Sequence, residues 1–173
     1  MHKYIIAIDP SGNFSEGKGT TGICVLKGTL PVKVVHTEFI QAKDYNTVEQ
    51  YWEAHIVALL KLTKRYKDVI WVIEDYLLYK TKAENQINSR METPKLIGII
   101  QYTAFMEHIP VHFQTASEVK TRWSDDILIH KNILYVHKNK TYVSGLSSAI
   151  NKHIKDSIRH GVHYCTFKNK GGN

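Results

Sequence analysis

The chain has 173 residues, 43% of them hydrophobic, with 23 Lys and Arg against 16 Asp and Glu, so its formal net charge is +7. This composition excludes a disordered chain, and the length predicts one domain, spanning 1–173, that folds without a disulfide or structural metal. No apolar stretch approaches the roughly 18 residues of a membrane span. Two cysteines are too few for a disulfide framework and indicate a reducing, cytoplasmic location.

The positive charge is concentrated in the last third of the chain. Residues 1–114 hold 13 basic and 12 acidic side chains, whereas residues 115–173 hold 10 basic and 4 acidic ones. A local positive field attracts polyanions such as nucleic acids, and the alternative is a basic surface that is merely solvated.

The first half of the chain predicts three strands and a helix. The strands are expected at residues 4–8, 21–26 and 32–40. The polar segment 11–20, which holds three glycines, predicts a long, mobile loop that joins the first two strands into an antiparallel hairpin. The helix that follows is expected to begin at Asn46 as its N-cap, with Glu49 in the capping-box position.

The second half alternates strands with helices. Strands are expected at 68–73 and 111–113, and helices at 94–107, from Ala116 and at 147–165. The helix at 94–107 is apolar on nearly all sides, so it is expected to be fully buried in one subunit or shared with a second copy. In residues 127–145 apolar and polar side chains alternate only weakly, which predicts either a small hairpin or an irregular segment on the surface. The order predicts an α/β fold, with helices flanking one mixed five-stranded sheet.

Two acidic residues directly follow apolar strands. Asp9 ends the first strand, and Glu74 ends the strand at 68–73. If these strands are parallel neighbours, both carboxylates emerge at the same edge of the sheet, where their mutual repulsion calls for a cation. Taken singly, either acid is equally compatible with a solvated turn.

The final helix carries further polar residues on one face. His153, Asp156 and His160 are spaced i, i+3 and i+7, although a solvated polar stripe would show the same spacing. Oxygen-rich donor sets suit Mg²⁺ or Mn²⁺. Two such ions can activate a water molecule and stabilise the leaving oxygen of a phosphodiester, which is the chemistry of many nucleases.

These motifs resemble those of RuvC-type Holliday junction resolvases, in the RNase H-like superfamily, and in particular the phage-encoded branch. The resemblance rests on Ile8-Asp9-Pro10-Ser11 with Thr21-Gly22, Val72-Ile73-Glu74-Asp75, Ala116-Ser117-Glu118-Val119-Lys120, and the helical segment from His153 to His160. In order and spacing, these pieces cover most of the chain. The loop at 12–20 and the segment 127–145 depart from the bacterial pattern.

The resemblance implies an RNase H-like fold and a homodimer that cleaves four-way DNA junctions in recombination and repair. It implies two Mg²⁺ ions per site, with Mn²⁺ as the alternative, and products with a 5′-phosphate and a 3′-hydroxyl. Asp9, Glu74 and Asp156 would be the catalytic, metal-binding carboxylates, and His153 would be the fourth ligand. A junction has two scissile phosphates, and the chain has acids for one active site only. A dimer is therefore expected, with the helix at 94–107 as its interface. A phage protein of this kind would work in the host cytoplasm.

The resemblance also implies a DNA-binding surface beyond the carboxylates. Tyr76 or Tyr79 would lie near the junction, and Lys120 would lie near DNA. The basic residues of the polar segment that follows Glu74 are expected to join this surface, namely Lys80, Lys82 and Arg90.

Three other functions are compatible with parts of the sequence. The loop from Gly17 to Gly22 superficially fits an actin-like or sugar-kinase phosphate loop, but the chain is too short for two domains and lacks P-loop spacing, so no nucleotide cofactor is expected. A non-catalytic DNA-binding protein would need the basic surface but not the acids. The main alternative is an RNase H-like nuclease that acts on other branched DNA or on RNA–DNA hybrids.

Overall fold

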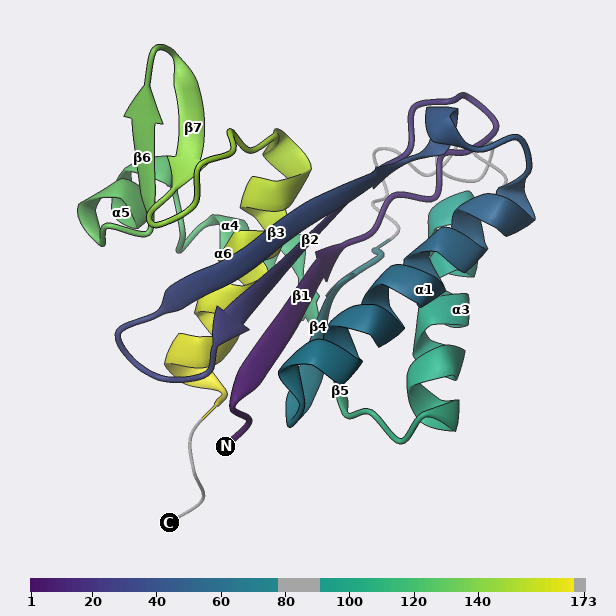
Figure 1. The fold of residues 1–173 in the computed structure, drawn as a ribbon, viewed down its shortest axis with the longest axis horizontal. Helices are drawn as coiled ribbons and strands as arrows, with labels where there is room; N and C mark the ends of the chain where they lie inside the picture. Colours follow the sequence, from purple (N-terminus) through teal and green to yellow (C-terminus); the bar gives the residue numbers. More distant parts are fainter. Residues whose placement is uncertain (78–90, 170–173) are drawn as a thin grey trace.

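The computed structural model describes residues 1–77 and 91–169. Its main sheet has five strands in the order β3-β2-β1-β4-β5 (Figure 1). The strands are β1 (Tyr4–Asp9), β2 (Thr20–Lys27), β3 (Lys33–Gln41), β4 (Val69–Asp75) and β5 (Val111–Thr115). Pairing is antiparallel between β1, β2 and β3 and parallel between β1, β4 and β5. The predicted mixed five-stranded sheet is therefore confirmed.

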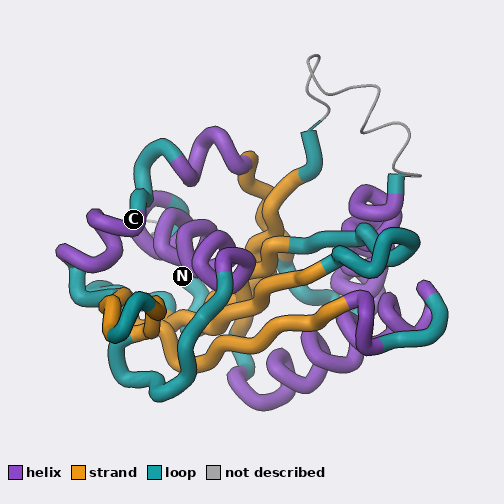
Figure 2. Tube along the Cα trace, turned by 90° about the horizontal axis from the view of Figure 1, so that it is seen from above, coloured by secondary structure: helices purple, strands orange, loops and turns teal. Residues whose placement is uncertain are grey.

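Helices cover both faces of this sheet (Figures 1 and 2). One face carries α1 (Val48–Tyr66) and α3 (Glu92–Met106), and the other carries α6 (Lys152–Phe167). The short elements are η1 (Ala42–Asp44), α4 (Ala116–Lys120), α5 (Asp125–His130), β6 (Leu134–His137) and β7 (Lys140–Val143). Within the described ranges, no helix combines the length and apolarity needed to cross a membrane.

The apolar runs of the central strands divide between two cores. In β1, Ile5 and Ala7 pack on the side of α6, and Ile6 and Ile8 pack on the side of α1 and α3. All four side chains are fully buried. Because successive residues of a strand point to opposite faces, a strand covered on both sides must be apolar throughout.

The helix α1 begins one residue later than the sequence predicts. Thr47 is the N-cap: its hydroxyl accepts a hydrogen bond from the Gln50 amide at 3.2 Å, and the Gln50 side chain accepts one from the Thr47 amide at 3.3 Å. The capping box predicted from Asn46 and Glu49 is therefore wrong. Asn46 with Glu49 and Thr47 with Gln50 are both suitable residue pairs for a capping box. The extended backbone at Thr47 makes this residue the N-cap.

The helix α6 begins later than the predicted position 147. Its N-cap is Asn151, whose side-chain oxygen accepts a hydrogen bond from the Ile154 amide at 2.9 Å. The preceding residues are engaged elsewhere, because Ile150 donates its amide to the Thr141 carbonyl and Ala149 bridges to Tyr142. Pairing with the β6–β7 hairpin thus takes the place of the first predicted turns.

The helix α3 is covered on one side only. Its side chains Leu96, Ile100 and Ala104 are fully buried against the sheet. Tyr102 and Phe105, by contrast, are 65% and 74% exposed. The alternative of full burial within one subunit is therefore wrong, and an apolar outer face is left on this helix.

The contact between β2 and α6 depends on a glycine. A Cβ atom at Gly22 would overlap the backbone carbonyl of His153, at the start of α6. Further along α6, the helix also lies close to β2, because a Cβ at Gly161 would overlap the side chain of Leu26. Two glycines therefore set the distance between this helix and the sheet.

We expect Gly22→Ala to destabilise the protein by about 1–3 kcal/mol, because either β2 or the α6 backbone must move to accept the methyl group. The measurement is the free energy of unfolding in urea. Gly98→Ala is the matched control: Gly98 lies within α3 with open space around its Cα, so alanine there should stabilise by roughly 0.5–1 kcal/mol. Equal stability of the two variants would contradict the close packing at Gly22.

Candidate active site

The two strand-end acids lie side by side. Asp9 is the last residue of β1 and Glu74 the penultimate residue of β4, and the parallel register pairs Ile8 with Ile73 immediately before them. Both carboxylates therefore leave the sheet at the same edge, as the sequence predicts. Asp9 is only 7% exposed, so its charge has little access to solvent.

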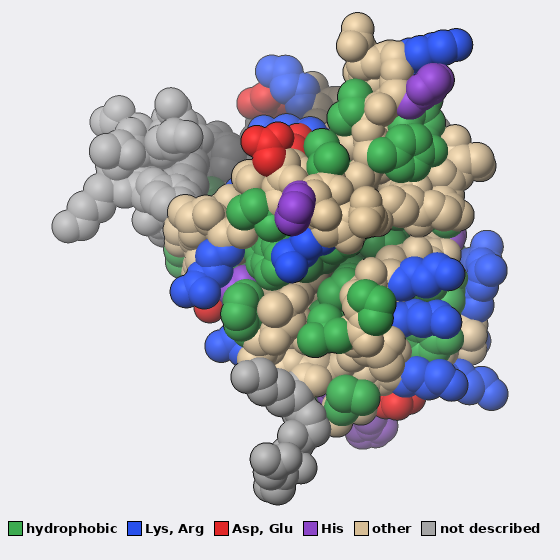
Figure 3. Space-filling view, turned by 90° about the vertical axis from the view of Figure 1, so that its left-hand side faces the viewer, with side chains coloured by type: hydrophobic (Ala, Val, Ile, Leu, Met, Phe, Trp, Pro, Cys, Tyr) green, Lys and Arg blue, Asp and Glu red, His purple; other side chains and the backbone are tan. Residues whose placement is uncertain are grey.

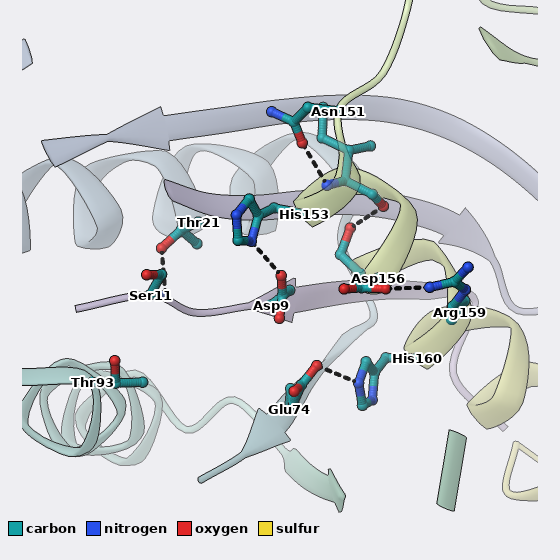
Figure 4. A network of polar contacts seen from close by, with 12 residues as sticks. Asp9, Ser11, Thr21, Glu74, Thr93, Asn151, His153, Asp156, Arg159 and His160 are labelled. Atoms are coloured by element: carbon teal, nitrogen blue, oxygen red, sulfur yellow. Dashed lines mark hydrogen bonds and ion pairs between the residues drawn. The ribbon is translucent and has the colours of Figure 1, made fainter. Parts of the chain in front are cut away.

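The helix α6 brings two histidines to these carboxylates (Figure 4). The His153 Nδ1 atom lies 2.9 Å from Asp9 Oδ2. About two turns further along the helix, the His160 Nε2 atom lies 2.9 Å from Glu74 Oε2, and its Nδ1 atom lies 3.1 Å from Gln114 Oε1. His160 is fully buried, and its ring is held between two side-chain oxygens.

The third acid, Asp156, lies between two cationic side chains. The Lys120 Nζ atom is 3.3 Å from Asp156 Oδ2 and 3.4 Å from the Glu74 carboxylate. Arg159 forms ion pairs with both Asp156 and Asp125. The sequence interpretation placed Lys120 at the DNA surface, whereas the structure places its ammonium group among the carboxylates.

Burial and neighbouring charge separate the protonation behaviour of the two strand-end acids. Burial raises the pKa of Asp9 to about 6, and the nearby charges of Glu74 and Asp156 add to this, against the hydrogen bond with His153. Burial also acts on Glu74, but the hydrogen bond and charge of His160, with the charge of Lys120, outweigh it and lower the pKa of Glu74 to about 2. Glu74 therefore stays ionised to low pH, whereas Asp9 is the less stabilised carboxylate of the two and takes up a proton first.

The segment after Asp9 is fixed by a buried hydrogen-bond chain. The Ser11 amide donates to the Thr21 hydroxyl at 3.1 Å, and that hydroxyl lies 2.8 Å from His55 Nε2. His55 Nδ1 donates to the Tyr51 carbonyl at 2.6 Å, and the Tyr51 hydroxyl donates to the Ser11 carbonyl, also at 2.6 Å. The helix α1 thereby holds the backbone two residues beyond Asp9.

The loop between β1 and β2 is attached to α3. The Gly12 amide donates to the Thr93 hydroxyl at 3.0 Å, and Ser15 binds the buried Glu92 carboxylate through both its amide and its hydroxyl. A Cβ atom at Gly12 would overlap the Glu92 backbone. The prediction of a mobile loop did not anticipate these contacts, which involve residues about 80 positions away in the sequence.

Several residues of the site were not predicted. Gln114, Arg159 and the carboxylate contacts of Lys120 emerge only in the structure. The sequence placed His160 on the correct helix face but did not predict its contact with Glu74. Tyr76 is half-buried just beyond β4. The other proposed DNA-binding residues, Tyr79, Lys80, Lys82 and Arg90, lie outside the described residues.

Two solved structures are similar to this chain along nearly its whole length. The first is Thermus thermophilus RuvC in complex with Holliday junction substrate, with a TM-score of 0.71 and 14% identity over 97% of this chain and 96% of that one. The second is a Thermus thermophilus RuvC structure, with a TM-score of 0.62 and 14% identity over 95% and 94%. No protein-family model and no curated protein matches the sequence.

These similarities show the fold of the chain. Its mixed five-stranded sheet flanked by helices is the RuvC-type, RNase H-like fold that the sequence motifs predict. The assignment to the phage-encoded branch stays a prediction.

The buried His55 makes stability depend on pH. Burial lowers the pKa of His55 to about 4, whereas the unfolded chain protonates near 6.5, so its contribution is complete above about pH 6.5 and is lost as the pH falls towards 4. Between pH 7 and pH 5 we expect the wild type to lose about 2 kcal/mol more unfolding free energy than His55→Gln. Urea unfolding of both proteins across this range measures the difference, and parallel pH profiles would contradict it.

Proposed function

We propose that this protein is a metal-dependent endonuclease that resolves four-way DNA junctions by paired phosphodiester cleavage as a dimer. The observation that carries the proposal is the convergence of Asp9, Glu74 and Asp156, from two parallel strands and one helix, at one edge of the sheet. Buried, mutually repelling acids with perturbed pKa values are typical of functional sites.

The fold and the charge distribution support DNA as the substrate. A solved structure with this fold is described as a complex with a Holliday junction substrate. The segment 115–173, which contains α6, also carries most of the excess positive charge. Such a field favours binding of a phosphate backbone next to the carboxylates.

The donor set fits a hard divalent cation. Among the described residues, no three His, Cys, Asp or Glu side chains are already arranged to hold a metal ion. The acids are instead neutralised from within the chain, and the ammonium group of Lys120 lies between Glu74 and Asp156, where two negative charges attract a cation. Asp9, Glu74 and Asp156, with His153, would hold Mg²⁺ or Mn²⁺ in this cluster. When bound, two such ions would activate water and stabilise the leaving oxygen of a phosphodiester.

The side chains around the acids have separate roles in this proposal. His160 holds the Glu74 carboxylate in place and is itself positioned by Gln114. Arg159 fixes the Asp156 carboxylate through an ion pair. Lys120 keeps its charge, because the attraction of Glu74, Asp156 and Asp9 outweighs burial and raises its pKa, so it can bind a phosphate oxygen once the acids are otherwise neutralised.

The outer face of α3 supports a dimer. Tyr102, Phe105 and Met106 are 65%, 74% and 56% exposed in the single chain, and they lie in the last two turns of one helix. A second copy would remove this apolar area from water, and symmetric pairing of one surface with itself is the usual arrangement of homodimers. Two copies would supply one cluster of acids for each of the two scissile phosphates.

We expect Asp9→Asn and Glu74→Gln each to lower the rate of junction cleavage about a thousandfold, the equivalent of about 4 kcal/mol, because each removes a negatively charged metal ligand. Junction binding should be retained. The measurement is nicking of a synthetic four-way junction with and without Mg²⁺, together with binding by gel shift. Undiminished cleavage by either variant would refute the assignment.

The substrate specificity is tested in the same assay with a Y-fork, a linear duplex and an RNA–DNA hybrid. Symmetric nicks confined to the four-way junction would support a resolvase. Cutting of every fork would indicate a broader debranching nuclease, and cleavage of the hybrid alone would replace the proposal with a ribonuclease H activity. His153→Ala should lower the cleavage rate less than the carboxylate variants do, or its effect on the rate should differ between Mg²⁺ and Mn²⁺.

Phe105→Glu should convert the dimer to a monomer, because it places a charge in the centre of the proposed interface. Sedimentation gives the mass, and a cruciform plasmid distinguishes simultaneous cuts from single nicks. Leu30→Glu is the matched control, since Leu30 is 66% exposed in the connection between β2 and β3. If both variants remain dimeric and cut in pairs, the interface lies elsewhere.

A further inference from the structure

The hairpin of β6 and β7 is anchored at its base and projects at its tip. Leu134 and Val143, which pair across the base, are buried in the core on the α6 side of the sheet. The strands are joined by Lys138 and Asn139, both with positive φ, as in a tight two-residue hairpin turn. All residues of the tip, 137–140, are exposed, and Figure 1 shows the hairpin standing apart from the main sheet.

The hairpin is joined to the beginning of α6. The Ile150 amide donates to the Thr141 carbonyl at 2.8 Å, and Tyr142 forms a bridge with Ala149. A shallow groove lies between the two elements. Its lining consists of Asn139, Lys140, Thr141, Ala149, Ile150, Asn151, Lys152 and Lys155. Three of these side chains are lysines and none is acidic.

Most of the positive charge around this groove is uncompensated. Lys138, Lys140 and Lys152 are exposed, and none of them takes part in an ion pair with another described residue. Lys155 differs, because its ammonium group is paired with Asp125 at 2.7 Å. Figure 3 shows Lys and His side chains on the protrusion at the upper edge of the molecule. Three free lysines on two adjoining elements create a local field that attracts a polyanion.

The hairpin also presents aromatic and hydrogen-bonding groups. Tyr135 and Tyr142 are directly paired across the strands, with ring centroids 5.3 Å apart and planes at 16°. Alternation along the strands puts His137 and Lys140 on the same face as these rings. Tyrosine hydroxyls and lysines are common donors to DNA phosphates, and a two-stranded ribbon fits along a DNA groove.

The groove is next to the proposed active site. Lys152 precedes His153 in the chain, and Asn151 caps the helix that carries both His153 and Asp156. Figure 1 shows the hairpin near the N-terminal end of α6. A strand held in the groove would therefore lie near the turn of α6 that carries His153 and Asp156.

We propose that the β6–β7 hairpin and the first turn of α6 bind the sugar-phosphate backbone of a duplex arm of branched DNA. This inference rests on the proposed nuclease function and assigns a role to the β6–β7 hairpin, which the proposed active site does not use. The contact is to the backbone, so it adds affinity and orientation for the arm without sequence preference.

Charge removal at the tip tests the contact. The double variant K138Q/K140Q should bind a four-way junction about tenfold more weakly than the wild type, and the slope of log affinity against log salt should fall by about 1–2. Fluorescence anisotropy in the absence of divalent metal measures both quantities. K61Q/K64Q, which removes two exposed lysines from α1 on the opposite face of the sheet, is the matched control and should change neither.

A site-specific crosslink gives a second measurement. Burial raises the pKa of both native thiols, Cys24 and Cys165, to about 12, so a maleimide photocrosslinker should label Asn139→Cys selectively. Labelled Asn139→Cys should crosslink to an arm of the junction, and labelled Lys64→Cys should not.

The outcomes separate this inference from the function on which it rests. If the wild type binds and cuts junctions but K138Q/K140Q behaves like K61Q/K64Q and no hairpin crosslink forms, the hairpin contact is refuted and the nuclease function stands. If the wild type neither binds nor cuts branched DNA, the proposed function fails, and this inference fails with it.

Discussion

The site depends on the repulsion between acids that the fold buries side by side. Parallel pairing of β1 with β4 places Asp9 beside Glu74, and α6 adds Asp156, which is only 3% exposed. Ionised carboxylates in such surroundings are unfavourable unless positive charge and hydrogen bonds offset their desolvation. The surrounding side chains follow from this requirement, because nearly every polar group that reaches the acids is a cation or a histidine.

The charge compensation of the acids is incomplete, and the proposed metal binding follows from this. Glu74 is well supported by His160 and Lys120, so its pKa is low, whereas Asp9 has His153 as its single histidine contact and a raised pKa. A cation that entered the cluster would stabilise the ionised form of Asp9 most. It would also release Lys120 from the acids, which links metal binding to phosphate binding in the proposed mechanism.

The helix α6 connects the core, the acids and the proposed DNA surface. Its apolar side packs on β1 and β2 at a distance set by Gly22 and Gly161, which leaves no freedom to shift the polar side. The polar side delivers Asp156 and two histidines to the sheet edge. Its first turn adjoins the basic hairpin, so in the proposed function one helix would set both the geometry of the acids and the position of the DNA.

The sequence by itself determined the five strands of the main sheet, the strand-end positions of Asp9 and Glu74, and the helix face of His153, Asp156 and His160, because periodicity and strand ends are local properties of the chain. Only the tertiary structure decided where Lys120, Gln114 and Glu92 act, since their partners are 36 to 77 residues away. The starts of α1 and α6 were also decided there. Several residues could cap each helix, and the choice depends on which backbone groups long-range contacts have already engaged.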